Sequence, residues 1–432
     1  MIASETKEQC YENYKDSGIS WLEEIPHHWE LKRFKHIFKE KKITHNVELN
    51  CGSISFGKVV YKDDEKIPVS TKKSYQVLNN GEFLINPLNL NYDLKSLRIA
   101  LSDKDVVVSS GYIIVQNISE ISKDYYKWLL HIFDVAYMKT LGSGVRQTLS
   151  FTHIANSELV FPPLQEQTAI AQFLDDKTTK IDEAIAIKEQ QINLLKEREQ
   201  ILIHKAVTRG LDDSVLLKDS GVEWIGAIPE GWTLSKNGYI SRIIRGASPR
   251  PAGHPMYFDG TDVPWLAVGD ITKNENIYLN EAVNFLTNAG KKQSRYILKG
   301  TFVLSNSGAT LGVPKILNIS GCINDGILAF LDLKEELIDK IFLYYYFASQ
   351  TKRLRDEMNQ GATQPNLNTD LVKQLPIALP PLLEQKEISA YIETASQKIE
   401  TAIGLKEQEI EKLKEYKSSL INSVVTGKVR VC

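Results

Sequence analysis

The sequence predicts an α+β protein in which two mixed α/β globular domains are joined by two long helices that form an antiparallel coiled coil. Three observations carry this prediction. A Pro-Pro motif followed by a long periodic apolar pattern occurs twice, at residues 161–167 and 379–385. A short tryptophan-containing strap also occurs twice, and two dissimilar globular stretches lie between the repeated parts. The chain is therefore an internal repeat, and we expect a pseudo-twofold relation between its halves.

The spacing of the repeats divides the chain into segments. The strap motif, Lys-Asp-Ser-Gly followed by Trp, Ile-Pro and Trp, starts at Lys15 and returns 203 positions later. The Pro-Pro motif returns 218 positions later, so the second globular stretch is about 15 residues longer. We expect a first globular domain with its strap at 1–161, a central long helix at 162–217, a second globular domain with its strap at 218–379, and a distal long helix at 380–432.

Each Pro-Pro pair predicts the start of a helix of about 45 residues. Proline in the first turn loses no hydrogen bond, and Glu166 or Glu384 suits the positive end of the helix dipole. Gly210 and Gly427 mark the ends, because glycine readily takes the left-handed conformation that closes a helix.

The apolar residues of both helices recur at spacings of four and three, which is the pattern of a coiled-coil seam. Two such seams in one chain, each with few neighbouring helices, most economically cover each other. Charge does not choose between parallel and antiparallel pairing, but the twofold relation favours antiparallel, with Glu199 level with Lys406 and Lys188 level with Lys417. The expected seam is Ile181, Ile185, Lys188, Ile192, Leu195, Glu199, Leu202 and Ala206 in the first helix, and Ile399, Ile403, Lys406, Ile410, Leu413, Lys417, Leu420 and Val424 in the second.

The composition is that of a globular protein with two to three domains, since 42% of the 432 residues are hydrophobic and 25% are charged. No segment reaches 18 consecutive apolar residues, and the N-terminus lacks the apolar core of a signal peptide, so we expect a cytoplasmic protein without a membrane span. The four cysteines are far apart and none lies at metal-ligand spacing from a histidine, which disfavours disulfides and structural zinc: Cys10, Cys51, Cys322 and Cys432.

The net charge of −2 conceals an uneven distribution. Residues 30–161 carry 18 basic and 14 acidic side chains, and residues 233–379 carry 16 basic and 13 acidic ones. The globular stretches are therefore mildly basic and the helices and flanks acidic, which is compatible with nucleic acid and equally with an ordinary solvated surface.

The first globular stretch predicts short strands at 106–108 and 112–115, followed by an aromatic-rich helix at 124–141 that packs on them. The aromatic residues of this helix are expected in the core. The second stretch predicts a loop rich in Arg, Gly and Pro at 241–255 and a strand at 263–270. The second stretch also predicts a further loop at 305–312 and another aromatic-rich helix at 341–358.

Motifs for catalysis are missing from the sequence. The loop at 308–312 lacks the lysine and hydroxyl that end a phosphate-binding loop. Asn86-Pro87-Leu88 departs at its third position from the tetrapeptide of amino-methyltransferases, and no acidic pair with a lysine suggests a nuclease metal site. The simplest interpretation is a non-catalytic chain.

The doubled Pro-Pro-Leu-x-Glu-Gln helix start, the doubled strap and a Gly-x-x-Gln lead-in resemble the specificity subunit of type I restriction-modification systems over nearly the whole chain. The resemblance implies two target-recognition domains, each reading one half of a split site in double-stranded DNA, and an antiparallel helical spacer. It implies that this spacer docks two modification subunits, and that restriction subunits can join. S-adenosylmethionine for adenine methylation, and ATP and Mg for restriction, would then belong to the partner subunits, with no cofactor on this chain.

Side chains that reach bases or phosphates from loops are the candidates for DNA contact. In the first domain they are Arg98, Ser109, Ser110, Arg146 and Gln147, and in the second Arg245, Ser248, Arg250, Asn306, Thr310, Lys315, Gln364 and Asn366. An alternative from another class is a coiled-coil adaptor whose globular domains bind protein. A fused methyltransferase or nuclease is a weaker alternative, because no cofactor motif is visible.

Overall fold

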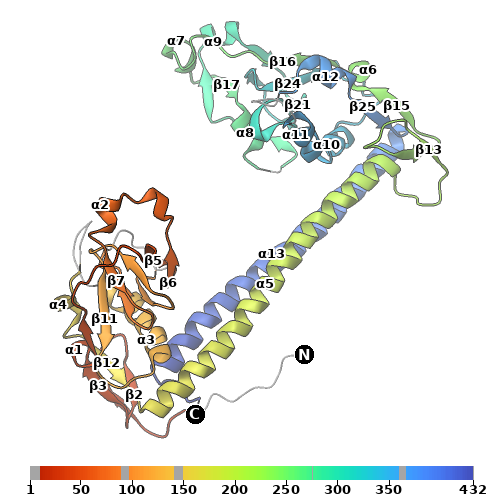
Figure 1. Cartoon of the computed structure of the whole chain (residues 1–432). Helices are drawn as coiled ribbons and strands as arrows, with labels where there is room; N and C mark the ends of the chain where they lie inside the picture. Colours follow the sequence, from red (N-terminus) through yellow and green to blue (C-terminus); the bar gives the residue numbers. More distant parts are fainter. Residues whose placement is uncertain (1–9, 89–96, 141–148, 275, 360–365, 432) are drawn as a thin grey trace. The chain divides into compact units, whose positions relative to one another are not determined.

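The computed structural model describes residues 10–88, 97–140, 149–274, 276–359 and 366–431 (Figure 1). The chain divides into two compact units, unit 1 with residues 1–188 and 408–432 and unit 2 with residues 189–407. Each unit therefore contains one globular part and a stretch of both long helices. This division cuts through the helices, whereas the scheme expected from the sequence treats each helix as a segment of its own.

The two long helices start and end where the sequence predicts. Helix α5 (Leu164–Arg209) has 46 residues and helix α13 (Leu382–Val425) has 44, and each begins directly after its Pro-Pro pair. Gly210 follows α5 with a φ of +75°, and Gly427 lies two residues beyond α13 with a φ of +79°. Both glycines thus adopt the left-handed conformation that closes a helix.

Within unit 1 the first part of α5 lies antiparallel to the last part of α13. Lys188 Nζ lies 2.5 Å from Glu409 Oε2, and Lys417 Nζ lies 2.7 Å from Asp182 Oδ1. The antiparallel direction agrees with the prediction, but the expected Lys188–Lys417 layer is wrong by about one heptad. A carboxylate just outside each seam attracts the lysine, and the shifted register avoids placing two ammonium groups side by side.

All predicted seam positions are buried or half-buried. In unit 1, Ile181, Leu420 and Val424 belong to the main hydrophobic core. In unit 2, Ala206 belongs to the core together with Ile392. The apolar stripe of each helix therefore continues directly into the core of a globular part, which anchors the helix ends.

The described residues of unit 1 form twelve strands of three to five residues each, and four α-helices besides α5 and α13. The strands are β1 (Tyr14–Asp16), β2 (Glu24–Pro26), β3 (Glu30–Arg33), β4 (Phe38–Glu40), β5 (Gly52–Ser55), β6 (Lys58–Tyr61), β7 (Gln76–Leu78), β8 (Phe83–Ile85), β9 (Ile99–Leu101), β10 (Val106–Val108), β11 (Ile113–Asn117) and β12 (Glu158–Phe161). The helices are α1 (Phe34–Ile37), α2 (Val69–Lys72), α3 (Lys123–Ala136) and α4 (Phe151–Ile154). Strands β4, β11, β8 and β9 form an antiparallel sheet, and the others pair as β1 with β2, β3 with β12, β5 with β6 and β7 with β10.

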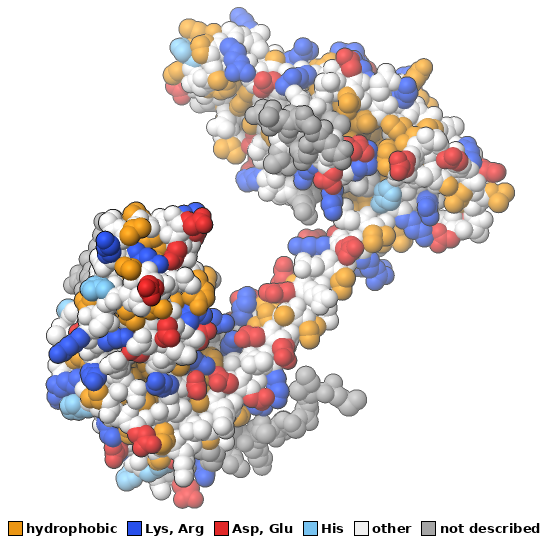
Figure 2. Space-filling view, viewed as in Figure 1, with side chains coloured by type: hydrophobic (Ala, Val, Ile, Leu, Met, Phe, Trp, Pro, Cys, Tyr) orange, Lys and Arg blue, Asp and Glu red, His pale blue; other side chains and the backbone are white. Residues whose placement is uncertain are grey.

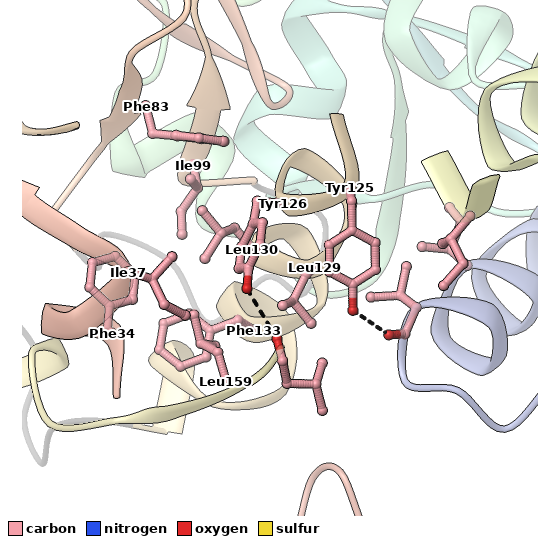
Figure 3. Close-up of a cluster of buried hydrophobic side chains, with 14 of the residues drawn as sticks. Phe34, Ile37, Phe83, Ile99, Tyr125, Tyr126, Leu129, Leu130, Phe133 and Leu159 are labelled. Atoms are coloured by element: carbon pink, nitrogen blue, oxygen red, sulfur yellow. Dashed lines mark hydrogen bonds between the residues drawn. The ribbon is translucent and has the colours of Figure 1, made fainter. Parts of the chain in front are cut away.

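The core of unit 1 is built on α3, as the aromatic pattern predicts (Figure 3). Tyr125, Tyr126 and Phe133 of α3 are fully buried. The Tyr126 hydroxyl donates to the carbonyl of Val160 at 3.2 Å, and the Tyr125 hydroxyl donates to the carbonyl of Val425 at 2.9 Å. Burial raises the pKa of both phenols, so they remain neutral donors.

Unit 2 has a five-stranded sheet in the order β16-β24-β21-β22-β18 and a four-stranded sheet in the order β19-β17-β23-β20. Its strands are β13 (Leu217–Asp219), β14 (Ala227–Pro229), β15 (Thr233–Lys236), β16 (Arg242–Arg245), β17 (Val263–Leu266), β18 (Tyr278–Leu279), β19 (Asn284–Leu286), β20 (Arg295–Ile297), β21 (Phe302–Ser305), β22 (Pro314–Leu317), β23 (Gly321–Ile323), β24 (Ile327–Leu331) and β25 (Pro376–Leu379). Its helices are α6 (Asn237–Ile240), α7 (Pro255–Phe258), α8 (Val268–Thr272), α9 (Asn288–Gln293), α10 (Lys340–Ala348), α11 (Thr351–Asn359) and α12 (Thr369–Gln374).

Two predicted boundaries in unit 2 are wrong for local reasons. The expected loop at 241–255 begins with strand β16, because Ile243 is buried and pairs with Phe330 of β24. The expected strand at 263–270 stops after Leu266, because the Asp270 carboxylate accepts the N–H of Ala267 at 2.8 Å and starts helix α8.

The predicted helix at 341–358 is divided into α10 and α11. Gln350 Nε2 donates to the carbonyl of Tyr346 at 2.9 Å, and Thr351 Oγ1 donates to the carbonyl of Gly312 at 2.8 Å. Side-chain hydrogen bonds to backbone carbonyls compete with the regular backbone hydrogen bonds of a helix. Such competition favours a break in the helix at this point.

The repeated segments form the same frame in both units. The hairpin of β1 and β2 corresponds to that of β13 and β14. Strand β12 pairs with β3 so that Glu158 faces Arg33, and β25 pairs with β15 so that Pro376 faces Lys236. The sheets between these frame elements differ in strand number and order, so the repeated flanks and divergent middles seen in the sequence are also seen in the fold.

A duplicated joint connects each strap to the long helices. Trp29 Nε1 donates to Glu166 Oε2 at 3.0 Å in unit 1, and Trp232 Nε1 donates to Glu384 Oε1 at 3.1 Å in unit 2. The first carboxylate also accepts the hydroxyl of Tyr11 at 3.0 Å. Burial alone would raise the pKa of Glu166, but hydrogen bonds from Trp29, His28 and Tyr11 outweigh it and lower that pKa. The glutamate expected from dipole chemistry is therefore also the anchor of the strap tryptophan.

The glutamine that follows each glutamate joins the long helix to an aromatic-rich helix. Gln167 Oε1 accepts the N–H of Ser122, the N-cap of α3, at 2.9 Å. Gln385 Oε1 accepts the N–H of Asp339, the N-cap of α10, at 2.8 Å. Both glutamine side chains are fully buried. The Glu-Gln pair of the repeated motif thus makes two separate connections in each unit.

In the described part of the chain, no helix is long and apolar enough to cross a membrane. Among the same residues, no cluster of three or more His, Cys, Asp and Glu side chains is placed to hold a metal ion. Cys10, Cys51 and Cys322 are free thiols, and burial raises the pKa of the last two. Cys432 lies outside the described residues.

Candidate nucleic-acid interface

Three of the predicted DNA-contact residues of unit 2 converge on one aspartate. Arg245 Nε donates to the carbonyl oxygen of Asp325 at 2.6 Å, and Ser248 Oγ donates to its Oδ1 at 2.6 Å. Arg250 Nη2 donates to Asp325 Oδ2 at 3.4 Å. Asp325 therefore holds both guanidinium groups while Arg245 and Arg250 remain exposed. The sequence placed these residues on one loop but gave no signal for their common partner.

The cluster lies where strands of the five-stranded sheet end. Strand β16 ends at Arg245, β21 ends at Ser305, and the turn that contains Asp325 leads into β24. A Cβ atom on Gly246 would lie 2.0 Å from the carbonyl oxygen of Asn324, so only glycine allows this approach. Close backbone contact therefore fixes the start of the arginine-bearing loop against the turn.

A third segment reaches the same cluster. Asn306 Nδ2 donates to the carbonyl of Asp325 at 3.4 Å, and the carbonyl of Asn306 accepts the N–H of Leu367 at 2.7 Å. Ser307 and the exposed Asn366 form an isolated bridge. Asn306 itself is fully buried, so it connects the segments and presents no side chain to solvent. Gln364 lies outside the described residues.

Two other predicted residues of unit 2 have different surroundings. Lys315 is 1% exposed, and its ammonium donates to the carbonyl of Asn274 at 2.8 Å and to that of Asn276. The Lys315 side chain therefore supports the loop of Asn274 and Asn276 from inside the protein, and its ammonium does not face solvent. Thr310 is half-buried, and its carbonyl accepts the hydroxyl of Ser305 at 2.5 Å.

The structure adds basic residues that the sequence analysis missed. Arg250 N–H donates to Gln293 Oε1 at 3.3 Å, which brings helix α9 beside the cluster. Lys291, Lys292 and Arg295 are exposed on this segment, and Lys291 Nζ lies 4.1 Å from the centre of the Tyr296 ring. The Lys-Lys-x-x-Arg run was the signal that could have identified them. Arginines and lysines from two segments thus surround the Asp325 turn, in a form suited to phosphate contact.

In unit 1, Arg98 occupies an internal position. Arg98 Nε donates to Asp134 Oδ1 at 2.8 Å, and its backbone N–H donates to Oδ2 at 2.6 Å. Arg98 is 5% exposed and Asp134 is fully buried. A contact between Arg98 and DNA stays a prediction, but the guanidinium of Arg98 has the buried carboxylate of Asp134 as its partner.

The turn between β10 and β11 carries the remaining described candidates of unit 1. Ser109 is half-buried and Ser110 is exposed. Gln76 Nε2 donates to the carbonyls of Ser109 at 3.3 Å and Tyr112 at 2.7 Å, so a buried amide fixes this turn from below. Arg146 and Gln147 lie outside the described residues.

An exposed aromatic residue also belongs to the candidate interface of unit 1. Strands β5 and β6 are joined by Phe56 and Gly57, whose φ angles are +46° and +73°. Phe56 is 81% exposed. A phenylalanine with positive φ is strained by about 1 kcal/mol, and such strain concentrates at binding sites. Exposed Lys58 and Lys62 follow it on the same hairpin. Phe56 was not among the predicted contact residues, because this hairpin was not predicted from the sequence.

On the face shown in Figure 2, basic and acidic side chains are interspersed over the globular parts and along the helices. On this face the described basic side chains form small local groups and no single large field. Salt at physiological concentration screens the attraction between distant charges. Such groups would therefore hold phosphates only where a basic side chain lies close to them.

The family described as "Type I restriction modification DNA specificity domain" matches this chain twice, over residues 26–197 and 229–415. Each match begins in a strap and ends within a long helix, which is the repeat unit seen in the fold. The chain belongs to this family. It is thus a type I specificity subunit, the non-catalytic component of a restriction-modification complex. The protein-binding adaptor and the fused-enzyme alternatives are not favoured.

Two curated proteins resemble this specificity subunit over nearly its full length. A putative type I restriction enzyme MjaX specificity subunit from Methanocaldococcus jannaschii is 25% identical, with 97% of both chains covered. The type I restriction enzyme MjaVIII specificity subunit from the same organism is 26% identical, with 97% of this chain and 96% of the relative covered.

Solved structures show the same fold at low identity. A chain from a study titled "Structural basis underlying complex assembly and conformational transition of the type I R-M system" has a TM-score of 0.68 and 16% identity, with 93% of this chain and 98% of that chain covered. The HsdS subunit from Thermoanaerobacter tengcongensis has a TM-score of 0.54 and 17% identity, with 94% and 98% covered. The mixed α/β class predicted from the sequence is thereby confirmed.

Proposed function

We propose that this specificity subunit reads an asymmetric, bipartite sequence in double-stranded DNA, with one half-site recognised by each globular part. The observation that carries the proposal is a duplicated frame around two different inserts. The joints of Trp29 with Glu166 and of Trp232 with Glu384 are alike, whereas the sheets between the frame elements differ. Different inserts place different donors and acceptors, so the two half-sites would have different bases.

The candidate contacts fall into two classes. In unit 2, Arg245 and Arg250 would reach phosphates or base edges from the Asp325 turn, with Lys291 and Lys292 adding phosphate contacts. In unit 1, Ser109 and Ser110 offer hydroxyls at a fixed turn, and Phe56 offers an aromatic surface against a base or a sugar. The hydrogen bonds to Asp325 support this assignment, because they orient the arginines before DNA binds.

The two long helices would act as an antiparallel coiled-coil spacer between target-recognition domains at residues 1–161 and 218–379. Their lengths and their buried seams support this role. We further propose that the chain acts in the cytoplasm and binds two modification subunits, to which restriction subunits add. S-adenosylmethionine would be bound by the modification subunits, and ATP and Mg by the restriction subunits.

Mapping methylated adenines tests the proposal. A host that lacks other adenine methyltransferases would express this chain with its modification subunit, and long-read sequencing would locate the modified bases. We expect one motif with two unlike half-sites separated by unspecified bases. A palindromic motif would refute the assignment of different half-sites to the two inserts. Absence of methylation with the chain present, in a host where both proteins are soluble and associated, would refute the DNA-reading role.

A further inference from the structure

Two grooves occupy equivalent places in the duplicated frame. Groove 1, in unit 1, has a volume of about 300 Å³ and is lined by Ile19, Arg33, Asn156 and Glu158, among others. Groove 2, in unit 2, has a volume of about 600 Å³ and is lined by Val222, Lys236, Gln374 and Pro376, among others. These four positions of groove 1 correspond to the four of groove 2, at an offset of 203 positions for the strap and β3 and of 218 positions for the segment before each long helix.

The backbone of the two grooves is the same. Each lies between the strap hairpin and a two-stranded sheet in which Arg33 faces Glu158 or Lys236 faces Pro376. The recognition inserts contribute little to either groove. The grooves are therefore features of the frame, and each lies within one unit.

The chemistry of three positions is shared. Each groove has a β-branched aliphatic side chain, Ile19 or Val222, an exposed cation, Arg33 or Lys236, and an exposed carboxamide, Asn156 or Gln374. A lysine donates to the carboxamide in both cases. Lys236 Nζ lies 2.7 Å from Gln374 Oε1, and Lys35 Nζ lies 2.8 Å from Asn156 Oδ1. The fourth position differs, since groove 1 has a glutamate where groove 2 has a proline.

The hydrogen bonds of the two carboxamides are exposed, so they give these positions only a weak structural reason to remain alike in two repeats whose inserts have diverged. A fold needs the buried parts of the frame, but an exposed cation contributes little to stability. The persistence of cation, carboxamide and aliphatic side chain in both grooves therefore indicates a common ligand. A carboxylate would satisfy the cation, and an adjacent apolar side chain would cover Ile19 or Val222.

We propose that grooves 1 and 2 dock the same segment of two copies of one partner subunit, and that this segment presents a carboxylate next to an apolar side chain. The inference rests on the proposed function for the identity of that partner, the modification subunit. It deepens that function by assigning the partner a pair of equivalent binding sites on the frame. One groove in each unit accounts for two copies, with contacts mainly to the frame.

Charge reversal tests the pair of sites. The full chain would carry Arg33→Glu, Lys236→Glu or both, and its complex with the modification subunit would be measured by native mass spectrometry and titration calorimetry. Lys66→Glu in unit 1 and Lys273→Glu in unit 2 are matched controls, since both lysines are exposed and lie outside the grooves. We expect each groove variant to weaken one of two binding events about tenfold or more, and the double variant to weaken both. Arg33→Lys should restore the first site.

The outcomes separate the two hypotheses. A wild-type chain that binds two modification subunits, with groove variants that bind two equally well, would overturn the groove assignment and leave the proposed function intact. A wild-type chain that binds no modification subunit would refute the proposed partner and with it this inference. Equal weakening by the control variants would assign the effect to general charge and also overturn it. Unchanged thermal unfolding would exclude misfolding as the cause of any loss.

Discussion

A double-mutant cycle on Arg98 and Asp134 would decide whether Arg98 stabilises unit 1 or contacts DNA. The pair is deeply buried, with exposed fractions of 5% and 0%, and its Nε to Oδ1 distance is 2.8 Å. Asp134→Asn preserves the shape of the side chain and removes its charge. Arg98→Met preserves much of the length of the side chain and removes the guanidinium. The double variant removes both charges together.

The expected magnitudes follow from burial. Removing one member of a buried ion pair leaves an uncompensated charge and costs about 3–5 kcal/mol, whereas replacing both members is close to neutral in several proteins. Each single variant should therefore lower the opening free energy of unit 1 by about 3 kcal/mol or more. The double variant should lose less than the sum of the two, because the residues share one interaction. The remaining loss would come from the backbone N–H of Arg98, which Asp134 also accepts at 2.6 Å.

Hydrogen exchange measured by mass spectrometry is the suitable assay, because it follows α3 in unit 1 and α10 in unit 2 separately within the same chain. Exchange in α3 should accelerate in each single variant and recover in part in the double variant, with α10 as the internal reference. DNA binding by the double variant gives the second readout, which should match wild type if Arg98 is only structural. Additive effects on α3 would refute the buried pair, and a loss of about 1–3 kcal/mol in DNA binding by a stable double variant would make Arg98 a DNA contact.

Three further predictions concern the interface, the spacer and the joint. Phe56→Ala should weaken specific DNA binding by about 1–3 kcal/mol if the ring stacks on a base, while Val69→Ala, another exposed apolar residue of unit 1, should leave the dissociation constant unchanged. Four residues inserted after Leu195 and four after Ile403 lengthen both helices by about 6 Å, so a methylation map should show the gap between half-sites grow by about one or two base pairs with the half-site bases unchanged. The hydrogen bonds that lower the pKa of Glu166 contribute stability above the ordinary glutamate pKa, and this stability is lost as pH falls through the lowered value. Unfolding measured between about pH 6 and pH 3 should therefore show a steeper loss in wild type than in Glu166→Gln, and equal slopes would contradict it.

The frame could be predicted from the sequence because its signals are local and occur twice. The Pro-Pro pairs and the closing glycines fix the helix ends by backbone chemistry alone. The register of the helices could not be predicted, because the decisive partners, Asp182 and Glu409, lie outside the apolar stripe used to align the helices. The Trp29–Glu166 joint was also hidden, since the two residues are 137 positions apart and no local pattern connects them.

The candidate interface was predictable only in part, because base-reading positions depend on tertiary contacts. Arg245, Ser248 and Arg250 were recognisable as a polar loop, and the structure brings them to one turn. Lys315 looked equally suitable in sequence, yet the backbone carbonyls of a neighbouring loop surround its ammonium. A lysine in the sequence looks the same whether its ammonium faces solvent or a ring of carbonyls, so only the fold separates these roles.

Each strap tryptophan, Trp29 or Trp232, lies at a joint where the start of one long helix meets the end of the other. A Cβ atom on Gly427 would lie 2.8 Å from the Trp29 ring, and one on Gly210 would lie 3.3 Å from the Trp232 ring. Each strap tryptophan is therefore held by the start of one long helix and covered by the end of the other. The core of unit 1 likewise includes Leu420, which is translated after all of unit 2. Unit 1 cannot complete its core until residues 408–432 are made, whereas all of unit 2 lies in one continuous stretch. The core that supports the first recognition insert is thus completed only after the distal helix has been made, which ties the integrity of this insert to that of the distal helix.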